Sequence, residues 1–138
     1  MCRQTVLVVE DEPSIRELVT DILRAEGYDV VEAQDGMEAV RVLDQHRPQA
    51  GGLALMVLGM MMPGMDGLGV LGHLCAVGVC LPVVAMSASR SLLAAAVAAG
   101  ASAVLYKPFD LNALRGAVAV HCTPCEHAPL PWAASVSA

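Results

Sequence analysis

The sequence predicts an α/β fold: a five-stranded parallel sheet of strand order 2-1-3-4-5 with helices on both faces. Two observations lead to it. Strand-like and helix-like segments alternate five times along the chain, and each strand-like segment is a short apolar run of the kind that is buried on both faces. Such alternation requires a parallel sheet with crossover helices. Because the crossovers are right-handed, the order 2-1-3-4-5 is the common arrangement at this size.

The expected strands are apolar runs closed by polar or turn-forming residues. The first is closed at once by three acids, Glu10, Asp11 and Glu12, and the third is apolar throughout and ends before Gly59. Short apolar runs bounded in this way are typical of buried parallel strands. The five expected strands cover residues 5–9, 28–33, 53–58, 82–86 and 103–106.

The expected helices have recognisable start and stop signals. Pro13 suits the first position of a helix, and Gly27 suits its end. Asp35 with Glu38 resembles a capping box, and Asp110 is suited to cap the last helix. The first helix is expected from Pro13 to the stop at Gly27, and the others over residues 37–46, 68–77, 91–99 and 111–120.

The length of 138 residues predicts one domain. We expect it over residues 1–121, followed by an irregular tail over 122–138 that contains three prolines. The tail carries Cys122 and Cys125 between two histidines, a pattern that can hold zinc. Without further ligands at fixed spacing, the composition favours an irregular tail over a zinc site.

Charge is distributed unevenly along the chain. The net charge of −6 argues against a nucleic acid as direct partner. Residues 67–89 carry no charge, but glycines and Pro82 interrupt this run, so we interpret it as a helix and a strand rather than a membrane span. With no export signal recognised, the five cysteines predict a cytoplasmic protein with reduced thiols.

Polar or unusual residues follow four of the expected strands. Glu10 and Asp11 end the first strand, Gly59 the third, Ser87 the fourth and Lys107 the fifth. In open parallel sheets, ligands bind at the carboxyl ends of the strands where the strand order reverses, which is beside strands 1 and 3. The sequence therefore predicts a site at this edge.

Four ordered motifs in this chain resemble the receiver domain of response regulators in two-component signalling, a flavodoxin-like fold. The resemblance runs from about residue 5 to residue 120. The motifs are Val-Val-Glu10-Asp11-Glu12-Pro13, Met62-Pro63-Gly64-Met65-Asp66-Gly67, Ser87-Ala88 and Lys107-Pro108-Phe109.

The resemblance implies a Mg²⁺ site and a phosphoryl pocket. Mg²⁺ prefers hard oxygen ligands, and a metal with a lysine neutralises charge in phosphoryl transfer. The implied roles are Asp11 as main metal carboxylate with Glu10 assisting, the Met61 carbonyl as further ligand, Lys107 as cation and Ser87 as switch hydroxyl. The resemblance also implies a cis peptide bond before Pro108.

The chain departs from the family pattern at three places. Gly59 stands where the family has its phosphate-accepting Asp, so we expect weak Mg²⁺ binding and a Lys107 that is free to pair with Asp11. Val104 stands where the family usually has a switch aromatic, and we expect Tyr106 on the other face of the strand, unable to replace it. The third departure is a longer link before the third strand, over residues 49–52.

These observations predict a single-domain receiver protein of a phosphorelay that is not an enzyme. It would not accept phosphate at the usual site, and would act by contact with a histidine kinase or another regulator. A homodimer is expected through residues 91–99, 103–106 and 111–120, because the first of these segments has no charged residue. Two alternatives stay open: phosphate acceptance by an atypical residue such as a neighbouring hydroxyl or acid, and a small-ligand module in the pocket beside Gly59.

Overall fold

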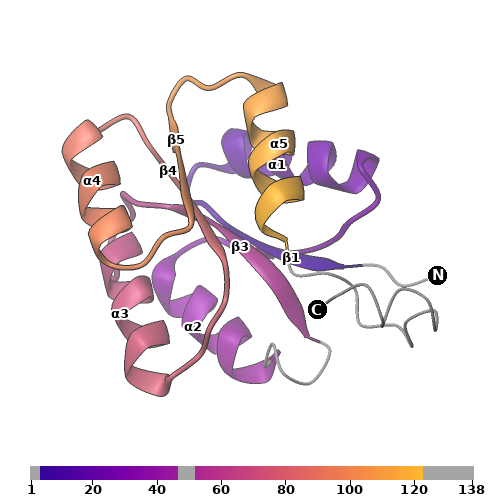
Figure 1. The fold of residues 1–138 in the computed structure, drawn as a ribbon. Coiled ribbons are helices and arrows are strands. Elements are labelled where there is room, and N and C mark those ends of the chain that lie inside the picture. Colours follow the sequence, from indigo (N-terminus) through magenta and orange to yellow (C-terminus); the bar gives the residue numbers. More distant parts are fainter. Residues whose placement is uncertain (1–3, 47–51, 123–138) are drawn as a thin grey trace, which may run out of the picture.

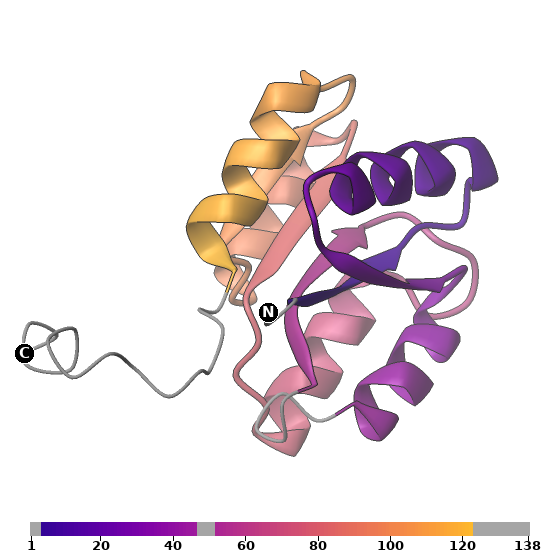
Figure 2. The ribbon, with the colours of Figure 1, turned by 90° about the vertical axis from the view of Figure 1, so that its right-hand side faces the viewer.

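The chain forms a single parallel sheet with helices packed on both of its faces (Figures 1 and 2). The computed structural model describes residues 4–46 and 52–122. The strands are β1 (Thr5–Val9), β2 (Asp29–Ala33), β3 (Leu53–Gly59), β4 (Val83–Ser87) and β5 (Ala103–Tyr106). The helices are α1 (Pro13–Ala25), α2 (Gly36–Gln45), α3 (Gly67–Val77), α4 (Arg90–Ala98) and α5 (Leu111–His121).

The strand order is β2-β1-β3-β4-β5 and all neighbours are parallel, which confirms the predicted topology. The register brings the carboxyl ends of the strands to one edge. Val9 of β1 pairs with Leu58 of β3, and the next residue of β3, Gly59, pairs with Met86 of β4. Ser87 of β4 in turn pairs with Tyr106 of β5, so the residues that follow each strand meet at this edge.

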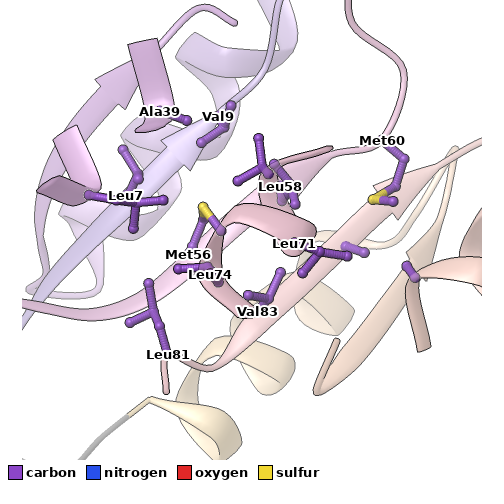
Figure 3. Close-up of a cluster of buried hydrophobic side chains, with 14 of the residues drawn as sticks. Leu7, Val9, Ala39, Met56, Leu58, Met60, Leu71, Leu74, Leu81 and Val83 are labelled. Carbon is purple, nitrogen blue, oxygen red and sulfur yellow. The ribbon is translucent and has the colours of Figure 1, made fainter. Parts of the chain in front are cut away.

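Two apolar clusters hold the layers together, one on each face of the sheet. On the first face, side chains of β1 and β3 such as Leu7 and Met56 pack against α2, α3 and α4 (Figure 3). On the second face, β-strand residues such as Val8 and Val57 pack against α1 and α5. Figures 1 and 2 show α1 and α5 together on one side and α2 and α3 on the other. Every residue of β3 is buried, as expected for a central strand covered on both faces.

Helix starts are fixed by short polar side chains. The side chain of Asp35 accepts a hydrogen bond from the backbone N–H of Glu38 at 2.8 Å, and that of Asp110 accepts one from Asn112 at 2.8 Å. Both predicted caps are confirmed. Ser89 caps α4 in the same way, by accepting a bond from Leu92 at 3.2 Å.

The strand ends differ slightly from prediction, and the difference concerns the site. β3 runs on to Gly59 and β4 to Ser87, one residue further than expected in each case. The backbone at these two residues therefore belongs to the sheet and not to the loops that follow the strands. β4 begins at Val83 rather than Pro82, consistent with the missing N–H of proline.

Two predictions fall mostly or wholly outside the described residues. The longer link over 49–52 is one, because the description resumes only at Gly52, and the tail beyond Cys122 with its zinc pattern is the other. Within residues 4–46 and 52–122, no helix is long and apolar enough to cross a membrane. The uncharged run over 67–89 forms α3 and β4, as the sequence predicted.

Candidate functional site

Gly59 lies buried at the end of β3, and the carboxylate of Glu10 lies directly over it. A methyl group placed on Gly59 would lie 2.8 Å from Glu10 Oε1 and 3.3 Å from Glu10 Cδ. The space that a side chain of residue 59 would enter is thus filled by the end of the Glu10 side chain. Because that end is flexible, a larger residue at 59 requires Glu10 to move rather than the backbone.

Glu10 is a buried acid with a partner for each carboxylate oxygen. Only 2% of the residue is exposed. Its Oε1 accepts a bond from Lys107 Nζ at 2.9 Å, and its Oε2 lies 3.3 Å from the backbone N–H of Glu12. Its backbone carbonyl also accepts a bond from Arg16 Nη1 at 2.7 Å. A buried charge is tolerated when it is paired and hydrogen-bonded in this manner.

Lys107 pairs with Glu10, which corrects the expectation that it would be free to pair with Asp11. Lys107 follows β5, its backbone N–H donates to the carbonyl of Ser87 at 2.9 Å, and its bond to Pro108 is cis as expected. The physical reason for the correction is space. Without a side chain at Gly59, the longer Glu10 side chain reaches inward to the ammonium, while Asp11 is exposed.

The Ser87 hydroxyl lies at the same edge and takes part in a local turn. Ser87 is 3% exposed, and its Oγ accepts a hydrogen bond from the backbone N–H of Ser89 at 3.0 Å. This bond holds the connection between β4 and α4. The structure therefore places Ser87 at the predicted edge, in a structural contact.

A pocket of about 480 Å³ lies at the same edge of the sheet, and only some of the predicted site residues line it. Its wall includes Asp11 and Met61, but neither Glu10, Ser87 nor Lys107. The other lining residues are Met60, Met62, Pro63, Asp66 and Leu92. Asp66 was not among the predicted site residues, and its side chain caps α3 by accepting a bond from the backbone N–H of Gly69 at 3.0 Å. Its place on the pocket wall follows from the turn that directly follows β3.

The described residues fit a Mg²⁺ ion poorly. This ion requires octahedral oxygen ligands and is usually held by one or two carboxylates. Both carboxylate oxygens of Glu10 are engaged and one oxygen of Asp66 caps α3, which leaves Asp11 as the acid of the pocket wall without a hydrogen bond among the described residues. Across residues 4–46 and 52–122, no group of three or more acidic, histidine or cysteine side chains gathers closely enough to hold a metal.

Val104 and Tyr106 share the exposed face of β5, so the expectation that Tyr106 lies on the other face was wrong. Val104 is 37% exposed and Tyr106 46% exposed, whereas Leu105 between them is buried. Residues two apart on a strand lie on the same side. The guanidinium of Arg90, the first residue of α4, lies 4.7 Å from the centre of the Tyr106 ring, in cation–π geometry.

Comparison with known proteins agrees with this fold. Residues 6–119 match the family model described as the response regulator receiver domain. The chain therefore belongs to the response-regulator receiver family of two-component signalling. At the edge that the sequence predicted as the site, the chain carries Glu10 and Asp11 after β1, Gly59 at the end of β3, Ser87 at the end of β4 and Lys107 after β5.

Curated relatives include both longer regulators and a protein of similar size. The chain is 40% identical over 111 residues to the response regulator MprA of Mycobacterium sp. strain KMS, covering 79% of this chain and 46% of that protein. It is 37% identical over 116 residues to the transcriptional regulatory protein PdtaR of Mycobacterium tuberculosis strain H37Rv, covering 82% and 54%. The chain thus spans about half the length of these two. It covers 93% of sporulation initiation phosphotransferase F of Bacillus subtilis strain 168, and the 120 aligned residues, 86% of this chain, are 31% identical.

Solved receiver structures superpose closely on the chain. The receiver domain of the Francisella response regulator 1452 gives a TM-score of 0.77 at 27% identity, covering 86% of this chain and 95% of that one. The chemotaxis protein CheY4 of Vibrio cholerae gives 0.74 at 26% identity, covering 86% and 98%.

Proposed function

We propose that this receiver does not accept phosphate at the family's usual site and acts by protein contact in one fixed state. The observation that carries the proposal is Gly59 at the end of β3. The sequence resemblance assigns the family's nucleophile to this position. Glycine has no side-chain oxygen, so no acyl phosphate can form there. On this proposal, residues 1–121 are one signalling domain that works as a binding protein and not as an enzyme.

The surroundings of Gly59 support the proposal. Phosphoryl transfer depends on positioning and on neutralising the charge of the phosphoryl group. The ammonium of Lys107 already faces the Glu10 carboxylate at 2.9 Å, so it offers no free positive charge to an incoming phosphate. We propose that Mg²⁺ binding, which the family uses, is weak here, because Asp11 is the one acid of the pair with no partner among the described residues.

The proposed contact surface is formed by α4, β5 and α5. Exposed apolar side chains gather on these three elements: Val97, Val104, Tyr106, Leu111 and Val120. α4 carries a single charged residue, Arg90, so little charge opposes burial of its face. We propose that this surface binds a histidine kinase or another regulator, or a second copy of the chain. Partners of this kind place the protein in the cytoplasm, where its thiols stay reduced.

One observation favours a second candidate, phosphate acceptance by a neighbouring acid. The Glu10 carboxylate lies where the missing carboxylate would be, next to Lys107. Its exposure of 2% and its two partners argue against attack on a phosphodonor. The small-ligand alternative is weaker, because Lys107 does not line the pocket that contains Asp11.

Intact-protein mass after incubation with a small-molecule phosphodonor and Mg²⁺ tests the proposal. The parent is expected to keep its mass, whereas a Gly59→Asp variant gains one acid-labile phosphoryl group. The variant is the matched control, because it shows that the remaining pocket is competent. A phosphoryl group on the parent would contradict the proposal, and its loss in Glu10→Gln would assign the second candidate.

A further inference from the structure

We propose that Glu10 replaces the missing carboxylate of residue 59, and that its ion pair with Lys107 holds the domain in its one state. This inference rests on the proposed function and adds a residue-level cause for the fixed state. It makes Glu10 a positioning residue, acting through Lys107, rather than a metal ligand. It also gives Gly59 a role of its own, since the glycine leaves room for the Glu10 carboxylate.

The space around Gly59 supports the proposal that Glu10 replaces a carboxylate of residue 59. The nearest atoms to a methyl group on Gly59 would be Glu10 Oε1 at 2.8 Å, then Glu10 Cδ and the carbonyl oxygen of Val9 at 3.3 Å each. A contact of 2.8 Å is closer than van der Waals packing allows, so even an alanine would displace the carboxylate. The Glu10 carboxylate can therefore take this position only because residue 59 has no side chain.

The charges of Glu10 and Lys107 support the proposed ion pair. Lys107 is the only lysine of the chain, and 23% of its side chain is exposed. A partly buried ammonium is stabilised by a nearby carboxylate. Glu10 supplies it at 2.9 Å and is itself held in place by the Glu12 backbone N–H and by Arg16 on its carbonyl. The acid is thus also held by the N-cap residue of α1 and by Arg16 within that helix.

The connection of Lys107 to the proposed contact surface supports the idea that the ion pair holds the domain in one state. Lys107 directly follows Tyr106, and its backbone N–H donates to the carbonyl of Ser87. Ser87 is in register with Tyr106, and Tyr106 packs against Arg90 of α4. The Glu10–Lys107 pair therefore holds the end of β5 beside α4. In this chain an internal acid, and not an added phosphoryl group, would set the arrangement of that surface.

Lys107 allows a direct test because it is the only lysine in the chain. Protein labelled with ¹³C-lysine gives a single CεH₂ signal, and acylation of the Lys107 amine is read by peptide mass spectrometry. We compare the parent with Glu10→Gln, which keeps the shape of the side chain, and with Gly59→Ala, which adds only a methyl group. Asp11→Asn is the matched control, since it removes the neighbouring exposed acid.

Both Glu10→Gln and Gly59→Ala are expected to shift the CεH₂ signal in the same direction and to raise the acylation rate several-fold. The double variant should add nothing beyond Glu10→Gln, because both changes break one contact. Asp11→Asn should match the parent. A Gly59→Ala protein with the parent's signal and rate would overturn the proposal, and so would a larger effect from Asp11→Asn. Should Gly59→Ala fail to fold, Glu10→Gln decides alone, and a parent-like signal and rate in it would overturn the proposal. No phosphodonor is present, so failure here is distinct from failure of the proposed function.

Discussion

Two neighbouring acids, Glu10 and Asp11, lie in opposite environments at the same edge of the sheet. Glu10 is 2% exposed, covers Gly59 and pairs with Lys107, whereas Asp11 is exposed and lines a pocket of about 480 Å³. The family uses such a pair together on a metal. Here Glu10 fills the space over Gly59 and is an inner acid paired with Lys107, whereas Asp11 is an outer acid with no partner among the described residues. Adjacent acids can therefore take different roles according to the space that a neighbouring strand leaves.

The largest expected effect concerns the inner acid when its cation is removed. Lys107→Met leaves the buried Glu10 carboxylate without its counter-charge, and it should lower the free energy of unfolding by about 3 kcal/mol. Urea denaturation measures this. Arg115→Met is the control, because the exposed pair of Arg115 with Glu26, 3.8 Å apart, should be worth less than about 1 kcal/mol. An equal loss of unfolding free energy in the two variants would mean that the buried pair stabilises the protein no more than the exposed pair.

The next effect compares the two acids directly. Glu10→Gln removes a charged hydrogen bond to Lys107 and should cost about 1.5 kcal/mol of unfolding free energy. Asp11→Asn alters an exposed side chain and should change stability by less than about 0.5 kcal/mol. The same urea titration measures both, and a larger cost for Asp11→Asn would reverse the assignment of inner and outer acid.

Much of this arrangement could be predicted from the sequence. Alternating apolar runs and helix signals predicted the topology, and the capping roles of Asp35 and Asp110 followed from residue type. The edge that gathers Glu10, Ser87 and Lys107 followed from the strand ends.

The partner of Lys107 could not be predicted in the same way. Residues 10 and 11 are adjacent, and sequence alone does not say which side chain turns inward. That choice depends on the three-dimensional space over Gly59, which the glutamate side chain of residue 10 fills. The expected face of Tyr106 was wrong for a simpler reason: residues two apart on a strand share a face, so Tyr106 lies on the same side as Val104.

The smallest expected effect concerns Mg²⁺ binding at the outer acid, Asp11. With Glu10 engaged by Lys107, about 10 mM Mg²⁺ should leave the parent's thermal unfolding unchanged. Gly59→Asp supplies another carboxylate and displaces Glu10, and with a dissociation constant of about 1 mM the same Mg²⁺ would stabilise it by about 1.4 kcal/mol. Differential scanning fluorimetry with Ca²⁺-free buffers measures the shift. Stabilisation of the parent as large as that of the variant would show that Asp11 and Met61 suffice for the metal.

The most direct test of a single, phosphate-independent state is the amide NMR spectrum of ¹⁵N-labelled protein before and after a small-molecule phosphodonor is added with Mg²⁺. We predict that the parent's signals at Ser87, Tyr106 and Lys107 stay in place, while those of Gly59→Asp move. If the parent's signals at these three residues move as well, the domain still switches with phosphate and does not stay in one fixed state.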